Sequence, residues 1–160
     1  MIGKALQSLC QFGPFTVRKN IEGITQEESL RAPEGGGNHM NWVMGHIVAT
    51  RSHLHRLLGK EPLWSEEEIA LYDRGAPGGI GRGEAIDMGK MIDDFEKSQE
   101  TFVAVLEGMS DEEFAGKGAP KGIGGESMGE QLAAFMFHEA YHAGQLGILR
   151  RGLGKPGGIT

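Results

Sequence analysis

The sequence predicts an all-α protein, a four-helix bundle whose helices are joined by long connections. Three observations support this fold class: apolar residues recur at helical spacing in four long segments, glycine-rich stretches separate these segments, and no alternating strand pattern competes with them. The glycine-rich stretches, which we expect to be loops, are residues 35–37, 77–83 and 116–125. A chain of 160 residues is long enough to form one hydrophobic core but short for two, so we expect residues 1–160 to form a single domain.

The first two expected helices cover residues 2–21 and 38–58. In the first helix, Pro14 lacks the amide donor of a regular turn, so we expect a kink there. In the second helix, Gly45 lowers helix propensity, which predicts that another backbone or a metal ion approaches the helix closely. The apolar stripes include Leu6, Leu9 and Val17 in the first helix and Met40, Val43, Met44, Ile47, Leu54 and Leu58 in the second.

The third and fourth expected helices cover residues 84–109 and 128–152. Ser127 and Glu130 have the spacing of a capping box, which satisfies free amide groups where the fourth helix begins. The same spacing predicts two short connecting helices, at Ser65 with Glu68 and at Ser110 with Glu113. The apolar stripes are Ile92, Phe95, Phe102, Leu106 and Met109 in the third helix and Leu132, Phe135, Leu146 and Leu149 in the fourth.

The composition excludes several classes of partner. A formal net charge of −6 lacks the positive charge that binds phosphates, so we expect no nucleic-acid partner. No apolar run approaches the roughly 18 residues of a membrane span, and polar residues interrupt the N-terminal segment where a signal peptide would be apolar. Cys10 is the single cysteine, so no intrachain disulfide can form, and we expect a reducing, cytoplasmic environment.

A pair of histidines in the fourth expected helix has the spacing of metal ligands. His138 and His142 lie one turn apart on the same helix face, where two imidazoles can bind one ion. The segment also matches the His-Glu-x-x-His pattern of zinc proteases, which take a third ligand from further downstream. Residues 143–160 contain no His, Glu or Asp, so the sequence argues against a protease.

A third ligand must then come from the second expected helix, which offers four histidines. His46 lies in the middle of the helix next to Gly45 and is the preferred candidate. His53 and His55 lie in the last turns, where we expect them to be exposed to solvent. His39, near the start of the helix, is a weaker candidate.

Two segments resemble those of the DinB-like (YfiT-like) metalloproteins. They are residues 41–46, Asn-Trp-Val-Met-Gly-His, and residues 138–146, His-Glu-Ala-Tyr-His-Ala-Gly-Gln-Leu. The resemblance implies a four-helix bundle, often dimeric, that binds one zinc or nickel ion per chain. It places the metal ligands at His46, His138 and His142. Characterised branches of that family include thiol-dependent S-transferases and isomerases, so a small-molecule substrate or thiol and a homodimer are the implied partners.

Three neutral histidines leave a fourth coordination position for water or substrate, which is typical of catalytic rather than structural metal sites. The first hypothesis for function is therefore a metal-dependent transferase or hydrolase, with a low-molecular-weight thiol as a candidate cosubstrate. The alternative is a non-catalytic metal- or ligand-binding protein of the stress response. The expected neighbours of the metal or of its pocket are Asn41, Trp42, Glu139, Tyr141 and Gln145.

Each of these neighbours also has a simpler role. For Trp42 we expect core packing, with a place in the pocket wall as the alternative. Tyr141 would otherwise be a surface residue, and Gln145 would pack between helices.

Two charged residues fall on apolar helix faces. Arg51 lies on the stripe of the second expected helix and Glu139 toward the apolar side of the fourth. We expect both side chains to extend to solvent, with a buried ion pair between them as the alternative.

Overall fold

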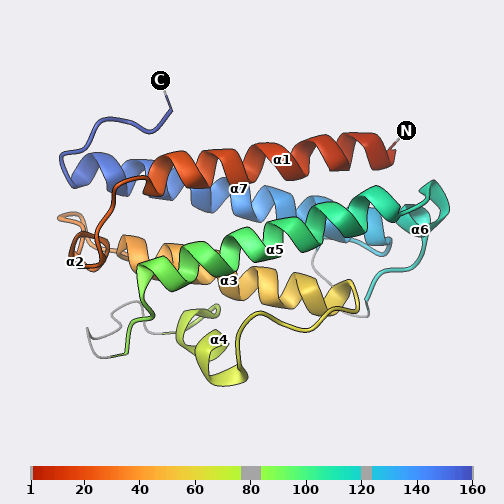
Figure 1. Ribbon diagram of the computed structural model, residues 1–160, viewed down its shortest axis with the longest axis horizontal. Coiled ribbons are helices and arrows are strands. Elements are labelled where there is room, and N and C mark those ends of the chain that lie inside the picture. The colour runs from red at the N-terminus through yellow and green to blue at the C-terminus, as the bar shows by residue number, and fades with distance from the viewer. Residues whose placement is uncertain (1, 77–83, 120–123, 160) are drawn as a thin grey trace.

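The computed structural model describes residues 2–76, 84–119 and 124–159. Four long helices dominate this part of the chain: α1 (Ile2–Ile21), α3 (Met40–Leu57), α5 (Met88–Gly108) and α7 (Met128–Gly152) (Figure 1). Among the described residues, β pairing is limited to one isolated bridge between Lys117 and Ser127. The predicted all-α bundle is confirmed.

The helix ends differ from the predicted ones by a few residues, and side-chain caps explain why. α5 begins at Met88, because the side chain of Asp87 accepts a hydrogen bond from the backbone amide of Lys90 at 3.0 Å. α3 begins at Met40, because Nδ1 of His39 accepts a hydrogen bond from the backbone amide of Trp42 at 3.1 Å. His39, the weaker ligand candidate, therefore serves as a helix cap.

Three short helices lie in the connections: α2 (Gln26–Ser29), α4 (Glu66–Tyr72) and α6 (Asp111–Ala115). The three predicted capping boxes begin α4, α6 and α7, and a fourth, formed by Thr25 and Glu28, begins α2, a helix that was not predicted. Pro14 lies inside α1, which is one helix throughout. Residues 77–83 of the predicted loops lie outside the described part of the chain, as do residues 120–123.

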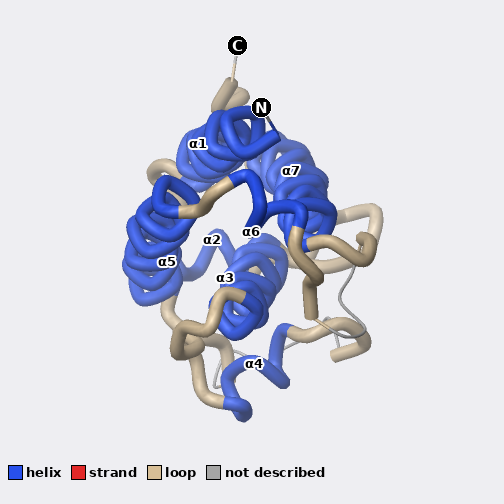
Figure 2. Tube along the Cα trace, turned by 90° about the vertical axis from the view of Figure 1, so that its right-hand side faces the viewer, coloured by secondary structure: helices blue, strands red, loops and turns tan. Residues whose placement is uncertain are grey.

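The direction of the helices requires long connections. α1 and α7 lie side by side and run in one direction, while α3 and α5 run in the other (Figures 1 and 2). Since α3 and α5 are parallel, the chain between them must return along the length of the bundle, and this return contains α4. α4 packs against α3 on the outer side of the bundle.

The core contains two clusters of buried apolar side chains. One cluster includes Trp42, Trp64 and Tyr72 and joins α4 to the bundle. The other includes Cys10 and Phe102 and joins α1 and α5 to α3, α6 and α7. No helix in the described part of the chain is long and apolar enough to span a membrane.

Candidate metal centre

Three histidines meet where α3 packs against α7. The Nε2 atom of His138 lies 3.2 Å from Nε2 of His46 and 3.1 Å from Nε2 of His142. One ring nitrogen of each residue lies within 4.8 Å of the other two, in a group that could hold a metal ion. The one-turn spacing on α7 places two of these rings, and the packing of α3 brings the third.

The spacing of the nitrogens fits a transition metal. In a tetrahedral site, imidazole nitrogens at about 2.0–2.1 Å from the ion lie about 3.3 Å from one another. The two Nε2 distances from His138 are close to this value. Within the described part of the chain, no cysteine, aspartate or glutamate joins the group.

Hydrogen bonds at the opposite ring nitrogens orient two of the histidines. Nδ1 of His46 donates to the backbone carbonyl of Tyr72 at 2.7 Å. Nδ1 of His142 donates to Oε1 of Gln145 at 2.7 Å, and Nε2 of Gln145 donates to the Tyr141 hydroxyl at 3.4 Å. A neutral imidazole that donates from Nδ1 keeps a lone pair on Nε2, which is the arrangement of a metal-binding histidine.

Both lone pairs face His138. Its Nδ1 is buried and has no hydrogen-bond partner among the described residues. A single proton on Nε2 of His138 can satisfy only one of the two neighbouring lone pairs, whereas a divalent cation would attract all three nitrogens. The donor set therefore fits a metal ion.

Burial keeps the three rings neutral. Desolvation, together with electrostatic interactions with His142, His46 and Arg74, lowers the pKa of His138 to about 4. Desolvation also lowers the pKa of His46 and of His142. All three residues are thus in the form that binds a metal at neutral pH.

The histidines open onto a pocket of about 860 Å³. Trp42 forms part of its wall and is buried, and its ring stacks on that of His46 with centroids 5.0 Å apart and planes 10° apart. Trp42 therefore has both of the roles considered from the sequence. Its Nε1 atom has no hydrogen-bond partner in the described chain. Tyr141 is 58% exposed at the pocket, and its ring contacts His142 edge to face, while Gln145 also lines the pocket.

A family model for the DinB superfamily matches residues 16–146. The chain belongs to the DinB superfamily. Its fold is similar to that in the crystal structure of a conserved protein from Enterococcus faecalis, with a TM-score of 0.70 and 14% sequence identity. The match covers 94% of this chain and 95% of that one, and at this identity it shows the fold alone. No curated protein has a significant sequence match to the chain.

In this DinB superfamily member, Gly45 makes room for an aromatic ring. A Cβ atom at Gly45 would lie 2.2 Å from Cδ1 of Tyr72. The predicted close approach is therefore real, but the partner is a side chain from α4 rather than another backbone or a metal.

The Tyr72 hydroxyl donates to Oδ1 of Asn41 at 3.0 Å. Asn41 thus supports Tyr72, which in turn orients His46. No pattern in the sequence pointed to this role of Tyr72.

Two other histidines of α3 differ in position. His55 is buried, with Nε2 3.1 Å from the Ser98 hydroxyl and Nδ1 2.9 Å from the backbone carbonyl of Glu61, so its predicted exposure is wrong. It is buried because the α3–α4 connection and α5 cover the last turns of α3. His53 is partly exposed and lines the same pocket as the three histidines, where its Nε2 lies 3.4 Å from Oδ1 of Asp73.

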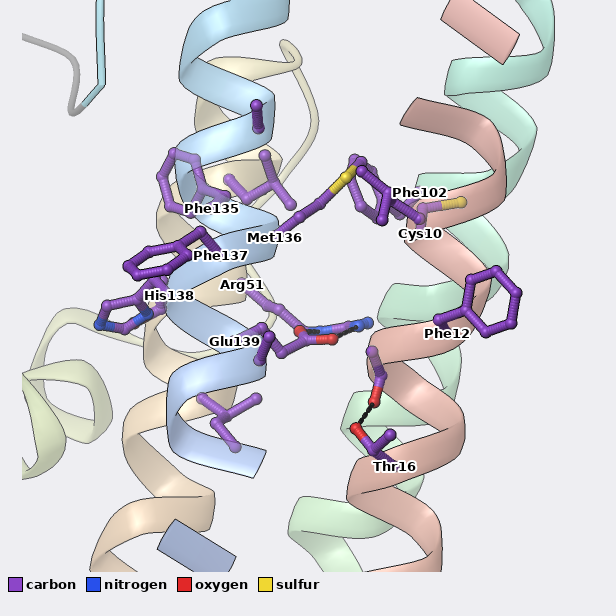
Figure 3. A pocket seen from close by; sticks show the side chains of 17 residues that line it. Cys10, Phe12, Thr16, Arg51, Phe102, Phe135, Met136, Phe137, His138 and Glu139 are labelled. Atoms are coloured by element: carbon purple, nitrogen blue, oxygen red, sulfur yellow. Dashed lines mark hydrogen bonds and ion pairs between the residues drawn. The ribbon is translucent and has the colours of Figure 1, made fainter. Parts of the chain in front are cut away.

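Glu139 points away from His138, although it follows this residue directly in the sequence (Figure 3). Its carboxylate forms a bidentate ion pair with the guanidinium of Arg51, with N–O distances of 2.6 and 2.9 Å. Arg51 is 3% exposed and also bonds Gln99 and the carbonyl of Phe95. The expectation that both charges reach solvent is wrong, because α1 and α5 cover this face. The pair lines a second pocket, of about 360 Å³, between α1 and α7.

Proposed function

We propose that this protein is a metal-dependent enzyme in which His46, His138 and His142 hold one zinc or nickel ion per chain. The observation that carries the proposal is the convergence of three Nε2 atoms at an open pocket. In the described chain, no aspartate, glutamate or cysteine adds a fourth ligand to these histidines. Three protein ligands and an open position are typical of catalytic metal sites. The reaction class that fits is transfer or hydrolysis, with a low-molecular-weight thiol as a candidate cosubstrate.

When bound, the ion would supply Lewis acidity that lowers the pKa of a water molecule or a thiol in the pocket. The protein's own residues would do the rest. Tyr72 and Gln145 orient the ligand rings, and Trp42 packs against His46, so the ring positions are set before a substrate enters. The pocket can hold a small molecule beside the ion, so that much of the rate would come from positioning.

We further propose a homodimer and a cytoplasmic location. Leu9 and Phe12 of α1 and Phe137 of α7 are 51%, 67% and 75% exposed and line the same pocket between the two helices. Large exposed apolar groups of this kind are typical of contact surfaces, and a second copy is the expected partner. The single buried cysteine is compatible with a reducing compartment.

The ligand assignment is tested by metal analysis of purified protein. We expect about one zinc or nickel ion per chain, and a sharp loss in His46→Ala, His138→Ala and His142→Ala. His53→Ala is the matched control, because His53 lines the same pocket but lies outside the group of three. Full occupancy in His46→Ala would disprove the assignment.

The catalytic part is tested with metal-loaded protein against a panel of thiols paired with electrophiles, and of hydrolysable esters and amides. Turnover that disappears in His46→Ala would support an enzyme. Stable metal binding without turnover across the panel would instead support the alternative, a metal- or ligand-binding protein of the stress response.

A further inference from the structure

The pocket beside the three histidines is lined by two arginines and one carboxylate, although the protein as a whole is acidic. The arginines are Arg56 and Arg74, and Asp73 is the one carboxylate among the described lining residues. The formal net charge of the chain is −6. Because neutral histidines would not cancel the charge of a bound cation, the occupied pocket would be more positive than the empty one. A cleft of this kind attracts small anions.

The two arginines of the pocket differ in their partners. The guanidinium of Arg56 forms an ion pair with Glu66 and also contacts His53. Arg74 is exposed and forms no ion pair or hydrogen bond within the described part of the chain. Its planar group of donors is therefore available to a carboxylate, which it can bind through two parallel hydrogen bonds.

Arg74 is also held near the three histidines by its neighbours in sequence. The carbonyl of Tyr72, two residues earlier, accepts the hydrogen bond from His46 at 2.7 Å. Two residues span at most about 7 Å, so the backbone of Arg74 stays close to the ligand ring. Consistent with this placement, the charge of Arg74 contributes to lowering the pKa of both His46 and His138.

We propose that Arg74 binds a carboxylate of the substrate while the reacting end of the same molecule reaches the three histidines. This inference rests on the proposed function and names the substrate class: a small molecule that carries a carboxylate and, at a short distance from it, a thiol or another metal-binding group. Arg74 would then determine specificity, and the metal would bind the reacting atom.

The test compares two thiols that differ only in charge, 3-mercaptopropionate and its neutral amide, 3-mercaptopropionamide. Each is titrated into zinc-loaded protein and followed by calorimetry. We expect the carboxylate to bind about tenfold more tightly, since one charge-assisted contact at a partly exposed site supplies about this much. The preference should shrink as salt is added.

Arg74→Gln should abolish this preference and leave the affinity for the amide unchanged, while Arg74→Lys should keep part of it. Arg56→Gln is the matched control, because that arginine lines the same pocket but is already paired with Glu66. Equal affinity of the two thiols in the unmodified protein, or an unchanged preference in Arg74→Gln, would overturn the inference, as would failure to bind either thiol. A failure of the proposed metal site would be seen in a different measurement: the zinc content of the purified protein would not depend on His46.

Discussion

The backbone carbonyl of Tyr72 lies 2.7 Å from Nδ1 of His46, while the ring of the same tyrosine packs over Gly45, the residue before that histidine. Tyr72, the last residue of α4, thus orients the candidate ligand His46 and fills the space beside Gly45. The short helix in the α3–α5 connection is therefore part of the candidate metal centre, although it carries none of the three histidines.

Gly45→Ala should destabilise the protein. Alanine is the better helix former, but its Cβ would lie 2.2 Å from Cδ1 of Tyr72 and would force the ring away. We expect a loss of about 1–3 kcal/mol in the free energy of unfolding, together with weaker zinc binding. Urea denaturation and a zinc titration would measure the two effects.

Gly144→Ala is the control for this substitution. Gly144 lies in α7 and is exposed, and no neighbouring atom lies within 4 Å of an added Cβ. Alanine there should leave zinc binding unchanged and raise stability by about 0.4–1 kcal/mol. If both alanine variants behave alike, the contact between Gly45 and Tyr72 does not have the role described above.

Gln145→Ala should weaken zinc binding by about tenfold, because the acceptor that orients His142 would be lost. Tyr141→Phe removes only a hydroxyl that is 3.4 Å from Gln145 and should have little effect. Competition of each variant with a zinc chelator would give the affinities. A larger loss of zinc affinity in Tyr141→Phe than in Gln145→Ala would contradict the proposed role of Gln145.

Glu139→Ala should cost about 3–5 kcal/mol of stability, because it leaves the buried guanidinium of Arg51 without its partner. The double variant Arg51→Met with Glu139→Leu should recover most of this loss. Arg18→Ala is the comparison for an exposed pair, with Glu96, and should cost less than about 1 kcal/mol. Urea denaturation of the unmodified protein and the three variants would measure these differences. A double variant as unstable as Glu139→Ala would show that the unpaired charge of Arg51 is not the cause of the loss.

Asp94 should make stability depend on pH. Burial alone would raise the pKa of Asp94, but hydrogen bonds from Lys90 and Trp64 and the charges of Lys90 and Lys97 outweigh it and hold the pKa below its usual value. A carboxylate with a lowered pKa in the folded state stabilises the protein above the unfolded-state pKa, and this stabilisation is lost as the pH falls through the folded-state value.

Asp94→Asn should therefore be less stable than the unmodified protein at pH 7, and the difference should shrink below about pH 4. Denaturation curves collected between pH 7 and pH 3 would show this convergence. A difference in stability that stays constant over the range would mean that the charge of Asp94 contributes nothing.

The sequence by itself determined the four long helices, the three capping boxes and the pairing of His138 with His142. These features depend on residues within one or two helical turns of each other, and such short spacings can be read directly from the chain. It also indicated a close approach at Gly45, because glycine inside a helix is costly unless something occupies the space beside it.

Only the tertiary structure decided what surrounds these residues. The sequence could not show that Tyr72 fills the space at Gly45, that Arg51 pairs with Glu139 or that His55 is buried. Tyr72, Glu139 and Ser98 are separated from their partners by tens of residues. Whether a charge or a ring nitrogen meets water or another side chain depends on which helices cover it. The pattern along α3 predicted one buried stripe, whereas helices on several sides bury nearly all of α3, and that burial is a property of the whole bundle.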